Sequence, residues 1–113
     1  MRTQSQKQGP IENGLYPLLG LVWFHMARTE IGFSIYTIGM ENFGLDEMEI
    51  LDVTDNPIEA RSFLIDIASY CVDAEVVLRD GETIGLTAEQ VCKITRSEGV
   101  NVDGMSLKID YHN

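Results

Sequence analysis

Apolar and polar positions alternate with a period of two along much of the chain, which is the spacing of side chains on a β-strand. From Gly20 to Arg28 both faces of this pattern are apolar. A segment apolar on both faces is typical of a central strand, or of a strand whose second face meets another subunit. After a short turn, the residues from Phe33 to Ile38 resume the pattern, so we predict a hairpin.

A third strand is predicted from Glu47 to Asp52, beyond a loop that contains Phe43. Met48 and Ile50 share one face of this strand, whereas Glu47 and Glu49 fall on the other. We therefore expect one face to be buried and the acidic face to be mostly in water. Phe43 is expected to pack back onto the core.

The pattern changes to helical spacing after Asn56, which is a favourable N-cap residue. Pro57 suits the first helical position, and Glu59 stands three residues after the cap, as in a capping box. Apolar residues then recur on one side of the helix: Ala60, Phe63, Leu64, Ile67, Ala68 and Cys71. We predict an amphipathic helix that packs on the sheet.

The rest of the chain contains two further hairpin signals. In the first, a strand from Glu75 to Arg79 and another from Glu82 to Leu86 flank Asp80 and Gly81, a dipeptide that favours a tight turn. The next residues, from Thr87 to Gln90, have the composition of a short helical turn.

A strand from Val91 to Thr95 follows. The second hairpin signal consists of Val100 to Val102, a turn at Asp103 and Gly104, and an alternating strand from Met105 to Tyr111.

Together these elements predict an α+β fold, in which a mainly antiparallel sheet built from hairpins carries one principal amphipathic helix on one face. The chain has 113 residues, which suits a single domain. Residues 1–14 contain few apolar side chains, so we expect a flexible tail, part of which need not be native, and a single domain from residue 15 to residue 113.

The charge balance narrows the choice of partners. With 18 acidic and 8 basic side chains, the formal net charge is -10. A field of that sign repels nucleic acid and anionic membranes, so we expect neither as a partner, and a basic protein is the natural complement.

Two cysteines, Cys71 and Cys92, stand 21 positions apart without a histidine cluster that would complete a metal site. We interpret them as small core residues of a cytoplasmic protein, although a disulfide between them is an alternative.

Carboxylates crowd the region from Glu41 to Asp55, where Glu41, Asp46, Glu47 and Glu49 are candidate binding residues together with Phe43. Paired carboxylates can serve acid-base catalysis or bind a hard cation. However, the spacing does not match a calcium-binding loop, and period-two alternation alone explains a solvated acidic face. We predict no metal site and no cofactor.

Nucleophilic catalysis finds no support, since Cys71 lies on the apolar face of the predicted helix and a buried thiol is inert. His25 lies in an apolar strand and His112 at the C-terminus, so no catalytic triad is predicted. Arg96 is a further candidate, either for binding an anion or, as we prefer, for a salt bridge with one of the many nearby acids.

Four segments carry a resemblance to a known family: YTIGMENFGLDEMEILD, DNPIEARSFLIDIASY, LRDGETIG and TRSEGVNVDGMSLKIDY. Their order and spacing resemble a bacterial family of domains of unknown function, number 4261 (DUF4261), over about Trp23 to Tyr111. In that family the segment resembles the C-terminal part of longer proteins, which implies a short member or an excised domain. The resemblance implies an α+β fold and no catalytic residues, and the N-terminal tail departs from the family pattern.

Two functional hypotheses follow. The first is a small acidic interaction module that self-associates through the strand from Gly20 to Arg28 and presents its acidic loop to a basic partner. The second is a small enzyme or cation-dependent regulator that uses the carboxylates from Glu41 to Asp55. We prefer the first hypothesis.

Overall fold

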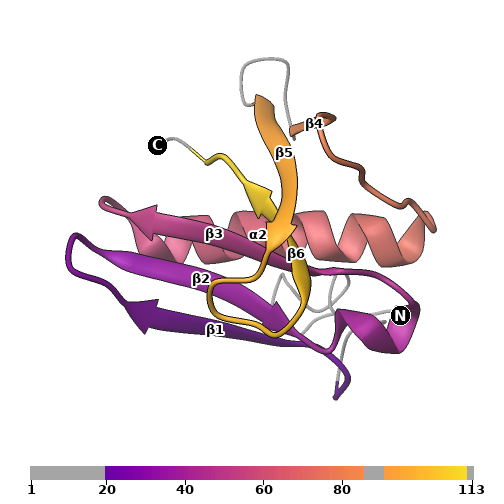
Figure 1. Cartoon of the computed structure of the whole chain (residues 1–113), viewed down its shortest axis with the longest axis horizontal. Coiled ribbons are helices and arrows are strands. Elements are labelled where there is room, and N and C mark those ends of the chain that lie inside the picture. The colour runs from indigo at the N-terminus through magenta and orange to yellow at the C-terminus, as the bar shows by residue number, and fades with distance from the viewer. Residues whose placement is uncertain (1–19, 86–90, 112–113) are drawn as a thin grey trace, which may run out of the picture.

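The computed structural model describes residues 20–85 and 91–111, which form one six-stranded sheet with a helix on one face (Figure 1). The order of strands across the sheet is β1-β2-β3-β6-β5-β4. Their bounds are β1 Trp23–Arg28, β2 Phe33–Ile38, β3 Glu47–Val53, β4 Thr83–Gly85, β5 Val91–Glu98 and β6 Met105–Ile109. The predicted α+β class, with a mainly antiparallel sheet and one principal helix, is confirmed.

Helix α2, Pro57–Asp73, begins as the sequence predicts. The side-chain oxygen of Asn56 accepts a hydrogen bond from the backbone N–H of Glu59 at 3.1 Å. The apolar face of the helix packs against the sheet, and the core contains its residues Ala60, Phe63, Leu64, Ile67, Ala68 and Cys71. Cys92 from β5 joins the same core, and within the described residues neither cysteine forms a disulfide.

The predicted β1–β2 hairpin is confirmed, with antiparallel pairing that runs from Trp23 opposite Ile38 to Arg28 opposite Phe33. Of the two alternatives for this segment, the central strand is wrong. Within the described residues, β1 pairs only with β2 and forms an edge of the sheet. Trp23, at the start of this edge strand, is 60% exposed.

One pair of strands departs from the hairpin pattern, since β3 and β6 run parallel. Glu47 lies opposite Ser106 and Glu49 lies opposite Lys108 across this pair. The pairing joins segments more than 50 residues apart in sequence, and it places β3 and β6 in the middle of the sheet.

The predicted strand from Glu75 to Arg79 is wrong, because these residues close the helix instead. Glu75 adopts the left-handed conformation with φ 54°, and the N–H of Val76 donates to the carbonyl of Cys71 at 3.0 Å, as in a Schellman motif. The turn at Asp80 and Gly81 is present, but β4, which follows it, pairs with β5 and not with the residues before the turn.

The predicted hairpin between residues 100–102 and β6 is also wrong. β5 extends to Glu98, beyond the predicted end at Thr95, and β6 pairs with β5 on one side and with β3 on the other. Residues 99–104 form the connecting loop, which is closed by a hydrogen bond from the N–H of Gly99 to the carbonyl of Gly104 at 2.7 Å. This loop lies in front of the sheet in Figure 1, on the side opposite α2.

The predicted tail of residues 1–14 and the helical turn from Thr87 to Gln90 lie outside the described residues. In the part of the chain that the structure describes, no helix has the length and apolar character needed to cross a membrane.

Candidate functional site

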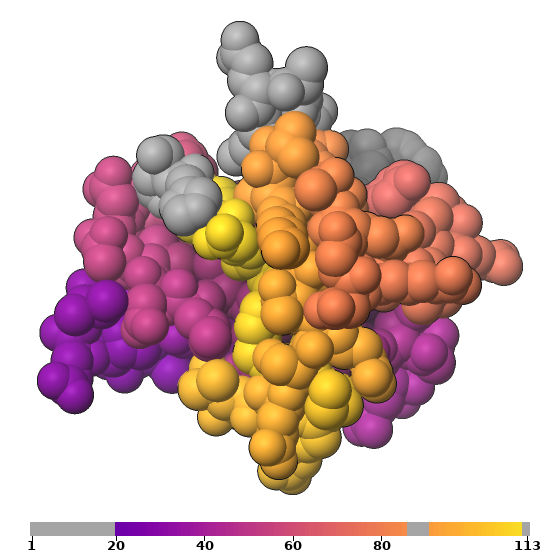
Figure 2. All heavy atoms as spheres, turned by 45° about the horizontal axis from the view of Figure 1, so that its top comes forward, coloured from indigo at the N-terminus to yellow at the C-terminus, as the bar shows by residue number. Residues whose placement is uncertain are grey.

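A groove of about 450 Å³ lies where the start of β3 meets the β5–β6 loop. We call it the acidic groove. Four carboxylates and four apolar side chains line it: Ile38, Glu41, Leu45, Asp46, Glu47, Val102, Asp103 and Met105. In the space-filling view, β5, β6 and their connecting loop (orange and yellow) form a ridge across the molecule, with the β1–β2 hairpin (indigo and purple) on one side (Figure 2). The sequence-predicted acidic loop therefore borders a concave surface and does not lie flat.

Two features of the backbone bring these residues together. The parallel pairing of β3 with β6 sets Glu47 opposite Ser106, so that Met105 and the preceding loop lie beside the start of β3. On the other side, the short 3-10 helix η2, Met40–Phe43, lies between two glycines in the left-handed conformation, Gly39 at φ 117° and Gly44 at φ 74°. These two glycines allow the chain to fold the acidic segment back against β3.

Phe43 does not line the acidic groove, but it is partly buried and packs against the core, as predicted. Its contact with the core fixes the position of the η2 segment. Glu41, two residues earlier, is exposed and lines the groove. The anchor and the acid therefore point in different directions from the same short helix.

Glu47 holds the corner between β2 and η2. Its carboxylate accepts hydrogen bonds from Thr37 Oγ1 at 2.7 Å and from the backbone N–H groups of Gly39 and Met40 at 3.0 and 3.1 Å. Carboxylate oxygens that accept three internal hydrogen bonds stabilise the local backbone. Glu47 therefore supplies structure and negative charge to the groove, and it is poorly placed to act as a general base.

Asp46 and Arg96 form the salt bridge that the sequence favours for Arg96. Arg96 Nε lies 2.7 Å from Asp46 Oδ2, and both side chains are partly exposed. The hydrogen bond and the negative charge of Asp46 raise the pKa of Arg96. The backbone N–H of Arg96 also donates to Asp80 at 2.7 Å. Arg96 therefore joins β5 to the edge of the groove but does not line it.

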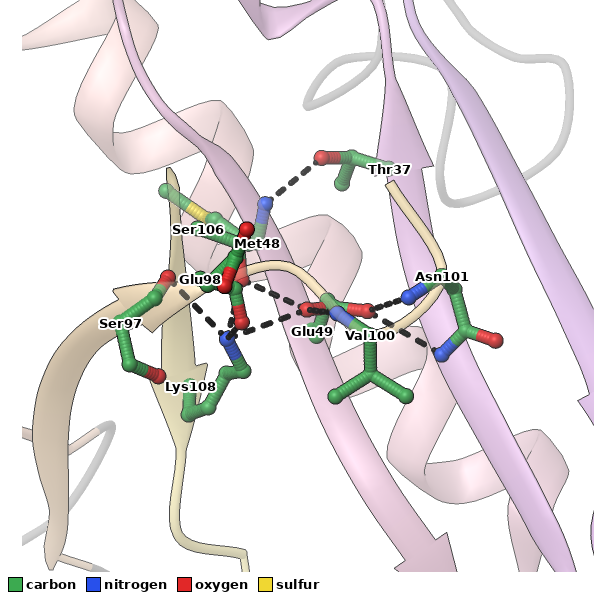
Figure 3. Close-up of polar contacts among 9 residues, drawn as sticks. All are labelled: Thr37, Met48, Glu49, Ser97, Glu98, Val100, Asn101, Ser106 and Lys108. Carbon is green, nitrogen blue, oxygen red and sulfur yellow. Dashed lines mark hydrogen bonds and ion pairs between the residues drawn. The ribbon is translucent and has the colours of Figure 1, made fainter. Parts of the chain in front are cut away.

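Glu49 contradicts the prediction of a solvated acidic face, because it is fully buried. The loop of residues 99–104 covers it, and its carboxylate accepts hydrogen bonds from Val100, Asn101 and Ser106 (Figure 3). Burial acts to raise the pKa of Glu49, but the hydrogen bonds from Ser106, Val100 and Asn101 outweigh burial, so the pKa lies below its ordinary value of 4.5. Glu49 stays charged and lies beneath the loop, outside the acidic groove.

The carboxylates of Glu41 and Asp103 are the exposed acids of the groove, one on each wall. Ile38 and Met105 are exposed apolar residues that line the same groove. A lysine or arginine side chain has an apolar stem and a cationic head, so it matches such a lining in both respects. Within residues 20–85 and 91–111, no three histidine, cysteine, aspartate or glutamate side chains are arranged to hold a metal ion.

One wall of the groove is predicted by the sequence, and the other is not. The sequence predicts a turn at Asp103, and the chain bends there with Gly104 at φ 76°, but nothing in the local pattern places Asp103 beside Glu41. The β3–β6 pairing creates that neighbourhood, and parallel pairing leaves no turn signature in the sequence.

A family model described as a domain of unknown function (DUF4261) matches residues 36–110 of the chain. This range includes every residue that lines the acidic groove, from Ile38 to Met105. The comparisons with curated proteins and with solved structures gave no match.

Proposed function

The chain belongs to the DUF4261 family, and from its acidic groove we propose that it is a small interaction module that binds a basic, partly apolar segment of a protein partner. The observation that carries the proposal is the combined lining of the groove, in which exposed carboxylates and exposed apolar side chains share one concave surface. Neither feature alone would suffice, since single exposed apolar residues and solvated acids are common on protein surfaces.

The charge of the whole chain supports a basic partner. At a net charge of -10, long-range attraction steers a cationic segment toward the protein and raises its association rate. The same charge disfavours a second copy of this chain as the occupant of the groove, because it would bring acids against acids.

The alternative function, a small enzyme or cation-dependent regulator, receives less support from the geometry. Glu47 and Glu49, the two central carboxylates of that hypothesis, accept internal hydrogen bonds from the backbone and from neighbouring side chains. A general base needs an oxygen that can reach a substrate proton. These two glutamates direct their oxygens toward the protein itself.

Binding can be tested with a fluorescein-labelled peptide that alternates arginine and leucine, followed by fluorescence anisotropy. We expect saturable binding that weakens as salt rises, because exposed charges are screened over about 10 Å at 0.1 M ionic strength. The double variant Glu41→Gln/Asp103→Asn removes the two exposed charges of the groove. At ~0.2–1 kcal/mol for each ion pair, it should weaken binding roughly twofold to thirtyfold.

A matched control removes two charges elsewhere. Glu30 and Asp73 are exposed carboxylates that do not line the groove, and Glu30→Gln/Asp73→Asn makes the same change in net charge. This control should retain nearly all of the affinity. Equal losses in both double variants would show unspecific charge attraction, and the absence of saturable binding by the unmodified chain would refute the proposed function.

Self-association through the strand from Gly20 to Arg28 is a separate part of the proposal. The edge position of β1 supports it, because an edge strand offers unpaired backbone groups to another strand, and the exposed Trp23 and Leu21 lie along this edge. Size-exclusion chromatography with light scattering should show a dimer that Trp23→Lys converts to a monomer. Ile58→Lys, at an exposed position on α2, should leave the dimer intact. A strict monomer at high concentration would exclude self-association and leave the groove proposal untouched.

We further propose a cytoplasmic location. Both cysteines are buried in the core and neither forms a disulfide, which is the usual state of cysteine in a reducing compartment and supports this assignment.

A further inference from the structure

Glu49 lies on the sheet face opposite α2, between Tyr36 of β2 and Lys108 of β6. A glutamate at such a position would normally reach water. Here the loop of residues 99–104 crosses over it and leaves the whole residue without exposure (Figure 3). The contact is therefore between a central strand and a loop about 50 residues further along the chain.

The donors around Glu49 come from the loop and from β6. From the loop, the backbone N–H of Val100 donates to Oε1 at 3.0 Å, and the backbone N–H and Nδ2 of Asn101 donate to Oε2 at 2.6 and 3.1 Å. From β6, Ser106 Oγ donates to Oε1 at 2.6 Å, and Lys108 Nζ lies 3.4 Å from the same oxygen. Every neighbour is a donor, so the site requires a group that only accepts hydrogen bonds.

Lys108 completes the attachment at the start of the loop. Its ammonium group donates to the carbonyls of Ser97 and Glu98 at 3.2 and 2.6 Å and to Ser106 Oγ at 2.7 Å. The cation thus binds the chain where it leaves β5, and the anion of Glu49 binds the next residues of the loop. Two opposite charges 3.4 Å apart fix successive parts of one segment.

The loop residues that follow, Val102 and Asp103, form one wall of the acidic groove. We propose that Glu49 is the positioning residue of that groove: its negative charge holds residues 99–104 in place and so sets the distance between Asp103 and Glu41. The expected effect on binding rests on the proposed function, whereas the attachment of the loop can be measured without any partner.

Other charged or titratable groups near Glu49 do not replace it in this role. Lys108 is its ion-pair partner, Tyr36 is its cross-strand neighbour on β2, and His25 of β1 stacks on Tyr36 with ring centroids 5.3 Å apart. The ammonium group of Lys108 has no acceptor, so it cannot take the place of Glu49 opposite the loop donors.

The test compares Glu49→Gln with the unmodified full-length chain by amide hydrogen exchange and by affinity for the arginine-leucine peptide. The glutamine amide places a donor against donors, so exchange at Val100 and Asn101 should accelerate by about tenfold or more. Peptide affinity should fall although no groove residue has changed. Asn101→Ala, which removes only the Nδ2 donor, is the milder second variant and should accelerate exchange in the same loop to a smaller degree.

A destabilised control separates positioning from a general loss of stability. Leu64→Ala creates a cavity on α2, where Leu64 is fully buried, and should cost comparable stability. Measured well below its unfolding temperature, it should retain both the loop protection and the peptide affinity. Unchanged exchange at Val100 and Asn101 in both Glu49→Gln and Asn101→Ala would overturn the inference. So would a peptide affinity that survives an opened loop.

The outcomes also distinguish the two proposals. If the unmodified chain does not bind the peptide but Glu49→Gln frees the loop, the proposed function fails and the loop attachment stands. If the peptide binds the unmodified chain and Glu49→Gln equally well, the groove proposal stands and the positioning role fails.

Discussion

Replacing Glu49 with glutamine should destabilise the fold by about 3–5 kcal/mol, which is the usual cost of removing one partner from a buried ion pair. The structure explains why the cost should be large. The Lys108 side chain is only 16% exposed, so it would lose its counter-ion in a poorly solvated place. Either orientation of the glutamine amide would also direct an N–H group at a loop donor, and each unsatisfied buried donor costs about 1–3 kcal/mol.

Urea unfolding at neutral pH, followed by circular dichroism, measures this loss. A domain of this size has a free energy of unfolding of about 5–15 kcal/mol, so the variant should unfold at a much lower urea concentration. Glu30→Gln, which changes an exposed glutamate in the β1–β2 turn, should change the free energy by less than about 0.5 kcal/mol. A loss below about 1 kcal/mol for Glu49→Gln would refute the reasoning, because it would mean that the buried charge contributes little.

A double-variant cycle with Lys108→Met tests whether the two charges act together. Each single variant leaves the remaining charge without its ion-pair partner, whereas the double variant removes both charges. The two single losses should therefore sum to about 1–3 kcal/mol more than the loss in the double variant. Additive losses would show that the 3.4 Å contact between Lys108 and Glu49 carries no coupling energy.

The contribution of Glu49 should also depend on pH in a defined direction. Its folded-state pKa lies below the ordinary value of 4.5, so the unfolded chain takes up the proton first as the pH falls. The stability from Glu49 is therefore present above about pH 4.5 and is lost as the pH falls below that value, through the folded-state pKa. The difference in free energy of unfolding between the unmodified chain and Glu49→Gln should narrow over this interval. A difference that widens there would contradict the assignment.

Three further predictions concern stability and reactivity. Burial raises the pKa of Cys71 from 9.0 to about 11. At pH 8 the thiolate fraction of Cys71, and hence its rate of reaction with a thiol reagent, should therefore be about 100-fold below that of a free thiol until urea unfolds the chain. Fast labelling of the folded protein would contradict this. Asn56→Ala should cost about 1 kcal/mol in urea unfolding by removing the helix cap, and Asn56→Asp should cost much less. Gly39→Ala should destabilise the fold by more than about 2 kcal/mol, since its Cβ would meet a backbone oxygen at 1.9 Å. Gly44→Ala, where the added Cβ would meet open space, should cost about 1 kcal/mol. Equal thermal stability of the two variants would show that the close approach at Gly39 is unimportant.

The elements that the sequence predicted correctly are those whose signals are local. Asn56 and Pro57 mark a helix start through hydrogen bonds and backbone angles within one turn, and the structure shows that start. The alternation of Met48 and Ile50 likewise gave the buried face of β3 correctly, because both residues enter the core. Salt-bridge formation by Arg96 followed from the excess of acids, although its partner Asp46 lies 50 residues away and could not be named.

The errors arose where distant residues decide the outcome. Period-two alternation placed Glu49 on a face that normally meets water, yet the loop of residues 99–104 supplies enough donors to bury the charge. Similarly, alternation suggested a strand after Glu75, but the helix uses these residues to satisfy its last carbonyls. The acidic groove depends on the parallel β3–β6 pairing, so its second wall could not be predicted from local patterns.

The most direct test of the acidic groove is a nuclear magnetic resonance titration of the full chain with the arginine-leucine peptide. Saturable shifts are expected at the amides of Ile38, Glu41, Asp103 and Met105, which come from both walls of the groove. Glu30, in the β1–β2 turn, should not shift. Shifts that do not saturate, or that saturate at residues away from the groove while these four remain unchanged, would contradict the proposal that this groove binds a basic segment.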